Sequence, residues 1–421
     1  MKLLQKIKKQ TEINSEANTE NDEMNDIIST DTGNPDEDNI VQMKQEVGKK
    51  GKLLIIAIIA LMVLGMIISF ARYSSIKQYQ HYDVVSSVDT SGDNIADYSV
   101  FAGNVLKITK DGASYIDEKG IVKWDVSYAM KMPKAKVCGD YAIVADMNGK
   151  DVYVFNIEGE VSRQKLNYDI ANVDVAEQGV YCLVLIGEDC NYIKGYDKDS
   201  NDIYELKVSI DKSGYPLDVD ISNDGQKLVA SYSKIEGTKI VAEIVTYNFG
   251  SVGKNENADR MMGSYTMNDA LYPIVRFLDN DTIAAFGDKD IRLYDMVEKP
   301  KEKAIIDLKG KEMQGIFGNS SYLGFISLAE EGASSKYKIY IYDTNGNEKS
   351  AIKYSDTYKK IYATEEELIV LGEMDCSILR FNGSTKFHGS FDKNIINIVP
   401  DSNKEEYVVI FENETKTIAL K

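Results

Sequence analysis

Three loops of this 421-residue chain carry residue types that bind divalent cations. Each combines Asp with further Asp or Asn side chains at close spacing, and they begin at Asp146, Asp197 and Asp343. That pattern resembles part of a calcium-binding EF-hand loop, which also needs a bidentate Glu at its twelfth position. The twelfth residue is Val208 counted from Asp197 and Tyr354 counted from Asp343, and neither side chain supplies a carboxylate. We therefore interpret the loops as tight turns, which favour Asp, Asn and Gly, and predict no metal site.

Histidine chemistry is limited because the chain has two histidines, His81 and His388. Neither lies in an HExxH zinc motif or beside a G-x-S-x-G nucleophile motif. The sequence has no G-x-x-x-x-G-K-[ST] or G-x-G-x-x-G phosphate loop, so it gives no support for nucleotide binding. Composition leaves room for paired catalytic acids, but nothing local singles out two of them. We predict a protein that is not an enzyme, with no catalytic residue and no cofactor.

An aromatic residue followed by Asp or Asn recurs six times, at spacings of 39 to 51 residues. Such a period is typical of a β-propeller, in which each repeat is one four-stranded blade. We expect the aromatic side chains to pack between blades and the Asp or Asn to begin the next turn. The six pairs are Phe155-Asn156, Tyr196-Asp197, Tyr247-Asn248, Tyr294-Asp295, Tyr342-Asp343 and Phe381-Asn382.

Alternating apolar runs predict an all-β propeller over residues 84–421, with eight blades favoured and seven the next choice. The last predicted blade lacks an outer strand, because the chain stops after residues 415–420. Residues 84–88 form a spare strand that could complete this blade and close the ring, which removes exposed sheet edges.

The longest insertion within the repeats, residues 250–267, falls in the expected fourth blade. It carries Arg260, Met261 and Met262, which we interpret as a possible binding edge because functional residues concentrate on long loops. The alternative is a surface elaboration without a binding role. Three of the four cysteines are scattered among predicted strands of different blades, and Cys182 and Cys190 could share one hairpin but are expected out of opposition. We therefore predict free thiols and no disulfide framework.

Before the repeats, residues from Leu53 to Phe70 form an apolar run without a charge. At about 1.5 Å per residue the run is long enough for a transmembrane helix, which we place at residues 53–71. Lys49, Lys50 and Lys52 precede it, so the N-terminus is expected in the cytoplasm and the propeller outside the cell membrane. A cleaved signal peptide is the competing interpretation, but its leader and apolar core would both be unusually long.

The segments on either side of this span are polar. Residues 1–52 contain no Phe, Tyr or Trp and many acidic residues, which predicts a disordered acidic cytoplasmic tail. Residues 72–83 are expected to form a short stalk. The formal net charge of the chain is −18, which argues against nucleic acid as a partner.

The runs "YSVFAGNVLKITKDGASYIDEKGIVKW" and "GDYAIVADMNGKDVYVFNIEGE", together with the acidic tail and apolar span, carry a family resemblance. The chain resembles a domain-of-unknown-function family of uncharacterised single-span membrane proteins from Gram-positive anaerobes. Its exported part is similar to WD40-like and quinoprotein-like β-propellers. The resemblance covers residues from about 50 to the C-terminus. The sequence departs from both of these propeller classes, because no Gly-His…Trp-Asp pair marks the blades and Trp124 is the only tryptophan. The resemblance therefore implies the propeller and no cofactor or catalytic residue.

These observations predict a membrane-anchored, non-enzymatic binding or scaffold protein of the cell envelope. Its partner would be an envelope protein or a wall polymer. Two alternatives stay open: a propeller hydrolase acting on polysaccharide or a small ester, and a single-span envelope sensor. A hydrolase would place convergent acids with raised pKa values at the central channel.

Overall fold

The computed structural model describes residues 57–69, 72–73, 76–89, 97–117, 120–256, 260–401, 403, 405–412 and 414–421. The chain divides into two units, residues 1–75 and 76–421. The predicted tail, residues 1–52, and the predicted span ends Leu53 and Phe70 lie outside the described residues. Between those ends, residues 57–69 are helical. Within the described part of the chain, no helix has both the length and the apolar character needed to cross a membrane.

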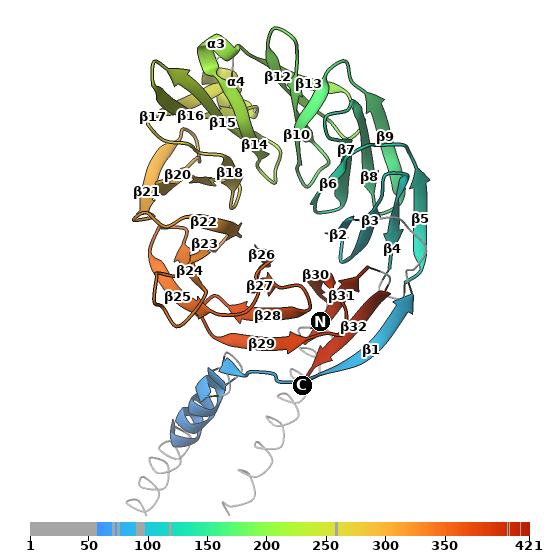
Figure 1. Ribbon diagram of the computed structural model, residues 1–421, viewed down its shortest axis with the longest axis vertical. Coiled ribbons are helices and arrows are strands. Elements are labelled where there is room, and N and C mark those ends of the chain that lie inside the picture. The colour runs from blue at the N-terminus through green and yellow to red at the C-terminus, as the bar shows by residue number, and fades with distance from the viewer. Residues whose placement is uncertain are drawn as a thin grey trace, which may run out of the picture. The chain divides into compact units, whose positions relative to one another are not determined.

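The described residues of the second unit form eight four-stranded antiparallel sheets, as the sequence predicts. Figure 1 shows them arranged as a ring, with the first strand of each blade towards the middle. Blades 1 to 4 are β2–β5 (Asp97–Phe101, Asn104–Ile108, Gly112–Ile116, Val122–Ser127), β6–β9 (Pro133–Cys138, Tyr141–Asp146, Asp151–Asn156, Gly159–Lys165), β10–β13 (Asp169–Val175, Tyr181–Ile186, Asn191–Tyr196, Asp202–Val208) and β14–β17 (Tyr215–Ile221, Lys227–Glu236, Lys239–Asn248, Met261–Asn268).

The second half of the ring repeats the same order. Blades 5 to 7 are β18–β21 (Ile274–Phe277, Thr282–Phe286, Asp290–Asp295, Lys301–Asp307), β22–β25 (Met313–Gly318, Tyr322–Leu328, Tyr337–Asp343, Glu348–Tyr354) and β26–β29 (Lys360–Ala363, Glu367–Leu371, Asp375–Arg380, Thr385–Ser390). The short helix α3 (Ile210–Ser213) lies between blades 3 and 4, and α4 (Ser251–Glu256) lies within blade 4 between β16 and β17.

Blade 8 joins the two ends of the propeller. It consists of β30 (Ile395–Pro400), β31 (Glu406–Phe411), β32 (Glu414–Leu420) and β1 (Tyr82–Asp89), in that spatial order from the inside outwards. Strand β1 pairs antiparallel with β32 from Tyr82 opposite Leu420 to Asp89 opposite Glu414. The predicted spare strand therefore closes the ring.

The core consists of apolar layers between neighbouring blades, because each sheet buries both faces against the sheets beside it. Phe155 belongs to the layer between blades 1 and 2, Tyr294 to that between blades 4 and 5, and Phe381 to that between blades 6 and 7. Five of the six repeat aromatics are buried, and Tyr247 is half-buried. The predicted packing role of the repeat aromatics is thus confirmed.

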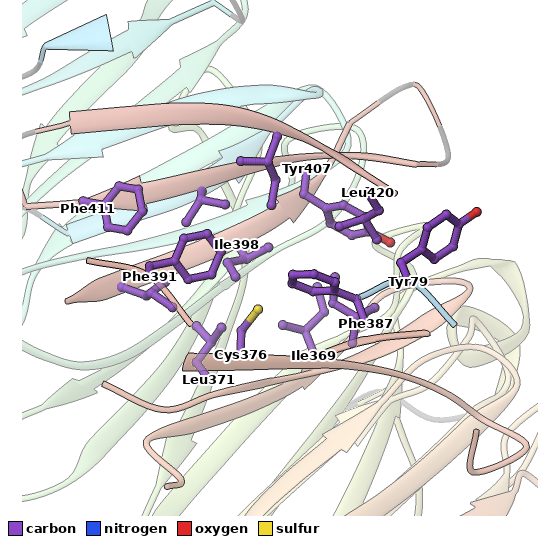
Figure 2. Packing of buried hydrophobic residues seen from close by; sticks show 14 residues of the cluster. Tyr79, Ile369, Leu371, Cys376, Phe387, Phe391, Ile398, Tyr407, Phe411 and Leu420 are labelled. Carbon is purple, nitrogen blue, oxygen red and sulfur yellow. The ribbon is translucent and has the colours of Figure 1, made fainter. Parts of the chain in front are cut away.

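The largest of these layers lies between blades 7 and 8 and includes a residue that precedes β1 (Figure 2). Tyr79, expected in the stalk, is buried at the edge of this layer near Phe387. Its backbone N–H donates to the Lys386 carbonyl oxygen at 2.8 Å. The part of the predicted stalk around Tyr79 therefore packs on the propeller.

Candidate functional site: a charged arc on the inner strands

Five charged side chains gather on the inner strands of four consecutive blades. Lys136 lies on β6, Asp174 on β10, Asp218 and Asp220 on β14, and Arg276 on β18. We call this group the charged arc. The three carboxylates are buried, whereas the side chains of Lys136 and Arg276 are 26% and 35% exposed. A propeller hydrolase would require convergent acids, so the contacts of these carboxylates bear on that alternative.

Each carboxylate of the arc accepts a hydrogen bond from the backbone of the next blade. Asp174 Oδ2 accepts from the Ile221 N–H at 3.0 Å. Asp220 Oδ2 accepts from the Phe277 N–H at 2.7 Å, and Asp218 Oδ2 in the same way from Val275 at 3.0 Å. Buried backbone donors require such partners. The arc therefore joins the inner strands of blades 3, 4 and 5.

The two cations of the arc lie beside its carboxylates. Lys136 Nζ lies 3.2 Å from Asp174 Oδ1. Arg276 Nη1 lies 2.5 Å from Asp218 Oδ2 and 3.5 Å from Asp220 Oδ1. Because charged groups are costly to bury unless they are paired and hydrogen-bonded, this pairing allows three carboxylates to occupy the interior.

Proton affinities in the arc follow its burial and its charges. Burial, and next the charge of Asp174, raise the pKa of the Asp220 carboxyl well above its ordinary value, although Arg276 and Lys136 oppose the shift. Burial likewise raises the pKa of the nearby Cys138 thiol to about 12. A carboxyl that keeps its proton could serve as a general acid. In Asp220, however, one oxygen binds the Phe277 N–H and the other faces Arg276.

Of the three residues of the predicted binding edge, Arg260 and Met261 lie together, whereas Met262 lies apart. Arg260 precedes β17 with a φ of 59°, and its carbonyl oxygen accepts from the Asn248 N–H at 2.9 Å. Met261 is 42% exposed, and both residues line a groove on the outer part of blades 3 and 4. Met262 instead is buried in the layer between blades 4 and 5.

The three loops that carry cation-binding residue types are held by hydrogen bonds that Asp carboxylates accept from backbone N–H groups. Asp197 Oδ1 accepts from the backbone N–H groups of Asp199 and Asn201 at 3.0 and 2.8 Å, which is an Asx turn. Asp343 does the same within its own loop. Asp146 instead binds two backbone N–H groups of the connection before β6. Among the described residues, no group of three or more His, Cys, Asp or Glu side chains is placed to hold a metal ion.

Two other sequence features are located by the structure. His388 lies exposed on the outer strand β29, where Nδ1 is 3.1 Å from Ser377 Oγ. The four cysteines are free, as predicted.

The charged arc was missed by sequence reasoning, although a signal for it exists. Asn172 and Asp218 are 46 residues apart, and so are Asp174 and Asp220, so both pairs occupy equivalent positions of consecutive repeats. Polar residues at one repeat position inside otherwise apolar inner strands mark side chains that join blades. Asn172 Nδ2 indeed donates to Asp218 Oδ1 at 2.6 Å.

Comparison with known proteins identifies a family and a fold. A model described as "Family of unknown function (DUF5711)" matches residues 75–420. The crystal structure of Sqt1 from Chaetomium thermophilum is similar with a TM-score of 0.54 and 10% identity, over 80% of this chain and 98% of that chain. Saccharomyces cerevisiae Sqt1 gives 0.51 and 10%, over 81% and 98%. BamB from Moraxella catarrhalis gives 0.47 and 10%, over 80% and 100%. At 10% identity the likeness to the two Sqt1 structures shows the fold alone. No curated protein matches the sequence significantly.

Proposed function

The chain belongs to the DUF5711 family of unknown function, and we propose that its propeller is a non-enzymatic binding or scaffold module of the cell envelope. One observation carries this proposal. The convergent acids on the inner strands are buried and engaged by the neighbouring blade's backbone N–H groups and by two cations. Contacts of this kind support a structural role of these acids in the ring.

We further propose that residues 53–71 anchor the chain in the cell membrane, with the N-terminus in the cytoplasm and the propeller outside. The apolar run from Leu53 to Phe70 and the lysines before it support this arrangement. The partner is then an envelope protein or a wall polymer. Nucleic acid is disfavoured by the net charge of −18.

A hydrolase acting on polysaccharide or a small ester is the second candidate. It is favoured by the raised pKa of Asp220, since strongly perturbed acids concentrate at functional sites. Structural ion pairs perturb pKa values as well, and the hydrogen bond that Asp220 accepts from the Phe277 N–H supports this structural reading. A hydrolase would lose its activity in an Asp220→Asn variant that still folds.

The proposed function can be tested by crosslinking in intact cells with an affinity-tagged full-length chain, followed by mass spectrometry of the captured molecules. The control is a tagged chain that ends at residue 75 and so lacks the propeller. We expect one or two defined envelope proteins, recovered with the full chain and absent with the control. Enrichment of glycan-strand fragments without any protein would shift the account to wall binding or hydrolysis.

A further inference from the structure

An open groove of about 640 Å³ runs beside β13, the outer strand of blade 3. One wall consists of residues 203–207, which are five consecutive residues of that strand. The opposite wall comes from blade 4 and includes Phe249, Arg260 and Met261. The groove thus contains two of the three residues that the sequence indicated as a binding edge.

The lining pattern shows which side of β13 the groove follows. Successive side chains of a strand point to opposite faces of its sheet. A groove on one face of blade 3 would therefore be lined by every second residue of β13. Because all five consecutive residues line it, the groove follows the outer edge of the strand. At this edge β13 ends the sheet order β10-β11-β12-β13.

The propeller already binds an extended segment at such an edge. Tyr79 forms a parallel bridge with Phe387 on β29, the outer strand of blade 7. The Tyr79 N–H donates to the Lys386 carbonyl oxygen, and Arg380 Nη2 donates to the Lys77 carbonyl oxygen at 2.5 Å. The outer edge of blade 7 therefore forms a main-chain hydrogen bond with a segment from outside its sheet.

The side chains of the groove define the chemistry of its occupant. Arg260 Nη1 is buried and has no hydrogen-bond partner among the residues that the structure describes, which is costly for a charged donor. Lys207 adds a second cation to the lining, whereas the carboxylate of Glu205 is engaged by Lys194 at 2.5 Å. Tyr204 and Phe249 stack with ring centroids 3.7 Å apart and provide an aromatic wall. The set favours a carboxylate next to apolar or aromatic side chains.

We propose that this groove binds an extended segment of a partner protein, added along the outer edge of β13. A carboxylate of the segment pairs with Arg260, and an apolar side chain contacts Phe249. This mode is β-strand addition, in which main-chain hydrogen bonds give affinity and side-chain contacts give specificity. The inference rests on the proposed binding function and names the kind of partner.

The first test uses the full chain and a displayed library of random ten-residue peptides with free C-termini. We expect the enriched peptides to share an acidic residue or the terminal carboxylate next to a large apolar side chain. Arg260→Gln should raise the Kd of these peptides about tenfold, since a charge-assisted hydrogen bond is lost. The matched control is Arg163→Gln, which changes an exposed arginine on β9, the outer strand of blade 2, and should leave the Kd unchanged.

A second measurement keeps the proposal falsifiable if Arg260→Gln disturbs the fold. Amide hydrogen exchange of residues 203–207 in the wild-type chain should slow about tenfold when an enriched peptide binds. The proposal is overturned if no peptide is enriched, if enriched peptides bind Arg260→Gln as tightly as wild type, or if protection appears elsewhere. If a cellular partner is captured equally well by the Arg260→Gln variant, the groove is not its binding site, whereas the proposed binding function stands. Failure to capture any partner would count against the proposed function itself.

Discussion

The charged arc and the closing region join blades of the same ring by different means. In the arc, buried carboxylates of one inner strand bind backbone N–H groups of the next. We define the closing region as β1, β32 and the apolar layer between blades 8 and 1. This layer has five buried apolar residues. The layer between blades 7 and 8 has fourteen. The small closing layer also borders a cavity of about 30 Å³.

The difference shows where the ring depends on polar contacts and where it depends on strand pairing. Blades 3, 4 and 5 follow one another along the chain and are locked together by charges. Blades 8 and 1 meet through a small apolar layer, and closure relies on the ladder between β1 and β32. Ser87 Oγ reinforces this ladder by donating to Glu414 Oε1 at 2.6 Å.

The largest effect is expected for Arg276→Met, which removes the guanidinium that compensates Asp218 and Asp220. Leaving buried charges without their partner should lower the free energy of unfolding by about 3–5 kcal/mol. The measurement is urea unfolding of the full chain, with Arg163→Met as an exposed control. A loss no greater than that of the control would mean that the arc does not hold the blades together.

A smaller effect is expected from adding one methylene group to the closing layer and one to the layer between blades 4 and 5. Val399→Ile at the closing layer can extend into the existing cavity and should stabilise the chain by about 0.8 kcal/mol. Val275→Ile, in the buried layer between blades 4 and 5, should destabilise it by about 1–3 kcal/mol because a close-packed site is overfilled. Thermal unfolding of both variants measures the difference, and equal signs would contradict the contrast in packing.

Asp220→Asn tests the pH dependence of the arc. The folded-state pKa of Asp220 is raised, mainly by burial. Its stabilising contribution is therefore complete below the unfolded pKa and is lost as pH rises through the folded pKa. The Tm of Asp220→Asn relative to wild type should accordingly increase as pH rises from about 4 to 8. A Tm difference that does not change over this range would remove Asp220 as the source of the effect.

Glu414→Gln should show the opposite sign with the smallest amplitude. Hydrogen bonds from Lys393 and then Ser87 lower the pKa of Glu414 to about 2. Its contribution is present above the unfolded pKa and disappears as pH falls towards 2. The pair of Lys393 and Glu414 lies at the surface, where solvent screens it, so the amplitude should be small. Wild type should thus exceed Glu414→Gln in Tm at pH 7 and match it near pH 2. An unchanged gap at low pH would contradict this role for Glu414.

The repeat could be predicted from the sequence because its signals are local. The aromatic-Asx pairs, such as Tyr294-Asp295, mark the end of the third strand in blades 2 to 7, and residues 84–88 were recognisable as a strand without a partner. Eight blades and closure by β1 follow from those signals.

The charged arc and the groove depend on contacts between distant parts of the chain. Arg276 reaches Asp218 across 58 residues, and the groove brings β13 next to Arg260. No short window of sequence contains both partners. The sequence singled out Arg260 and Met261 because they lie in an unusually long insertion, and their role as a binding edge stays a prediction. Met262 faces the core because side chains alternate along β17.

The most direct test of the central claim, that the arc is structural and the propeller binds a partner, compares Asp220→Asn with wild type in one experiment. Both full-length chains are crosslinked in intact cells, and captured proteins and released glycan fragments are quantified together. We predict that both chains recover the same envelope protein in equal amounts and that neither releases glycan fragments. Release of glycan fragments by wild type, lost in Asp220→Asn, would contradict the account and establish the arc as a catalytic site.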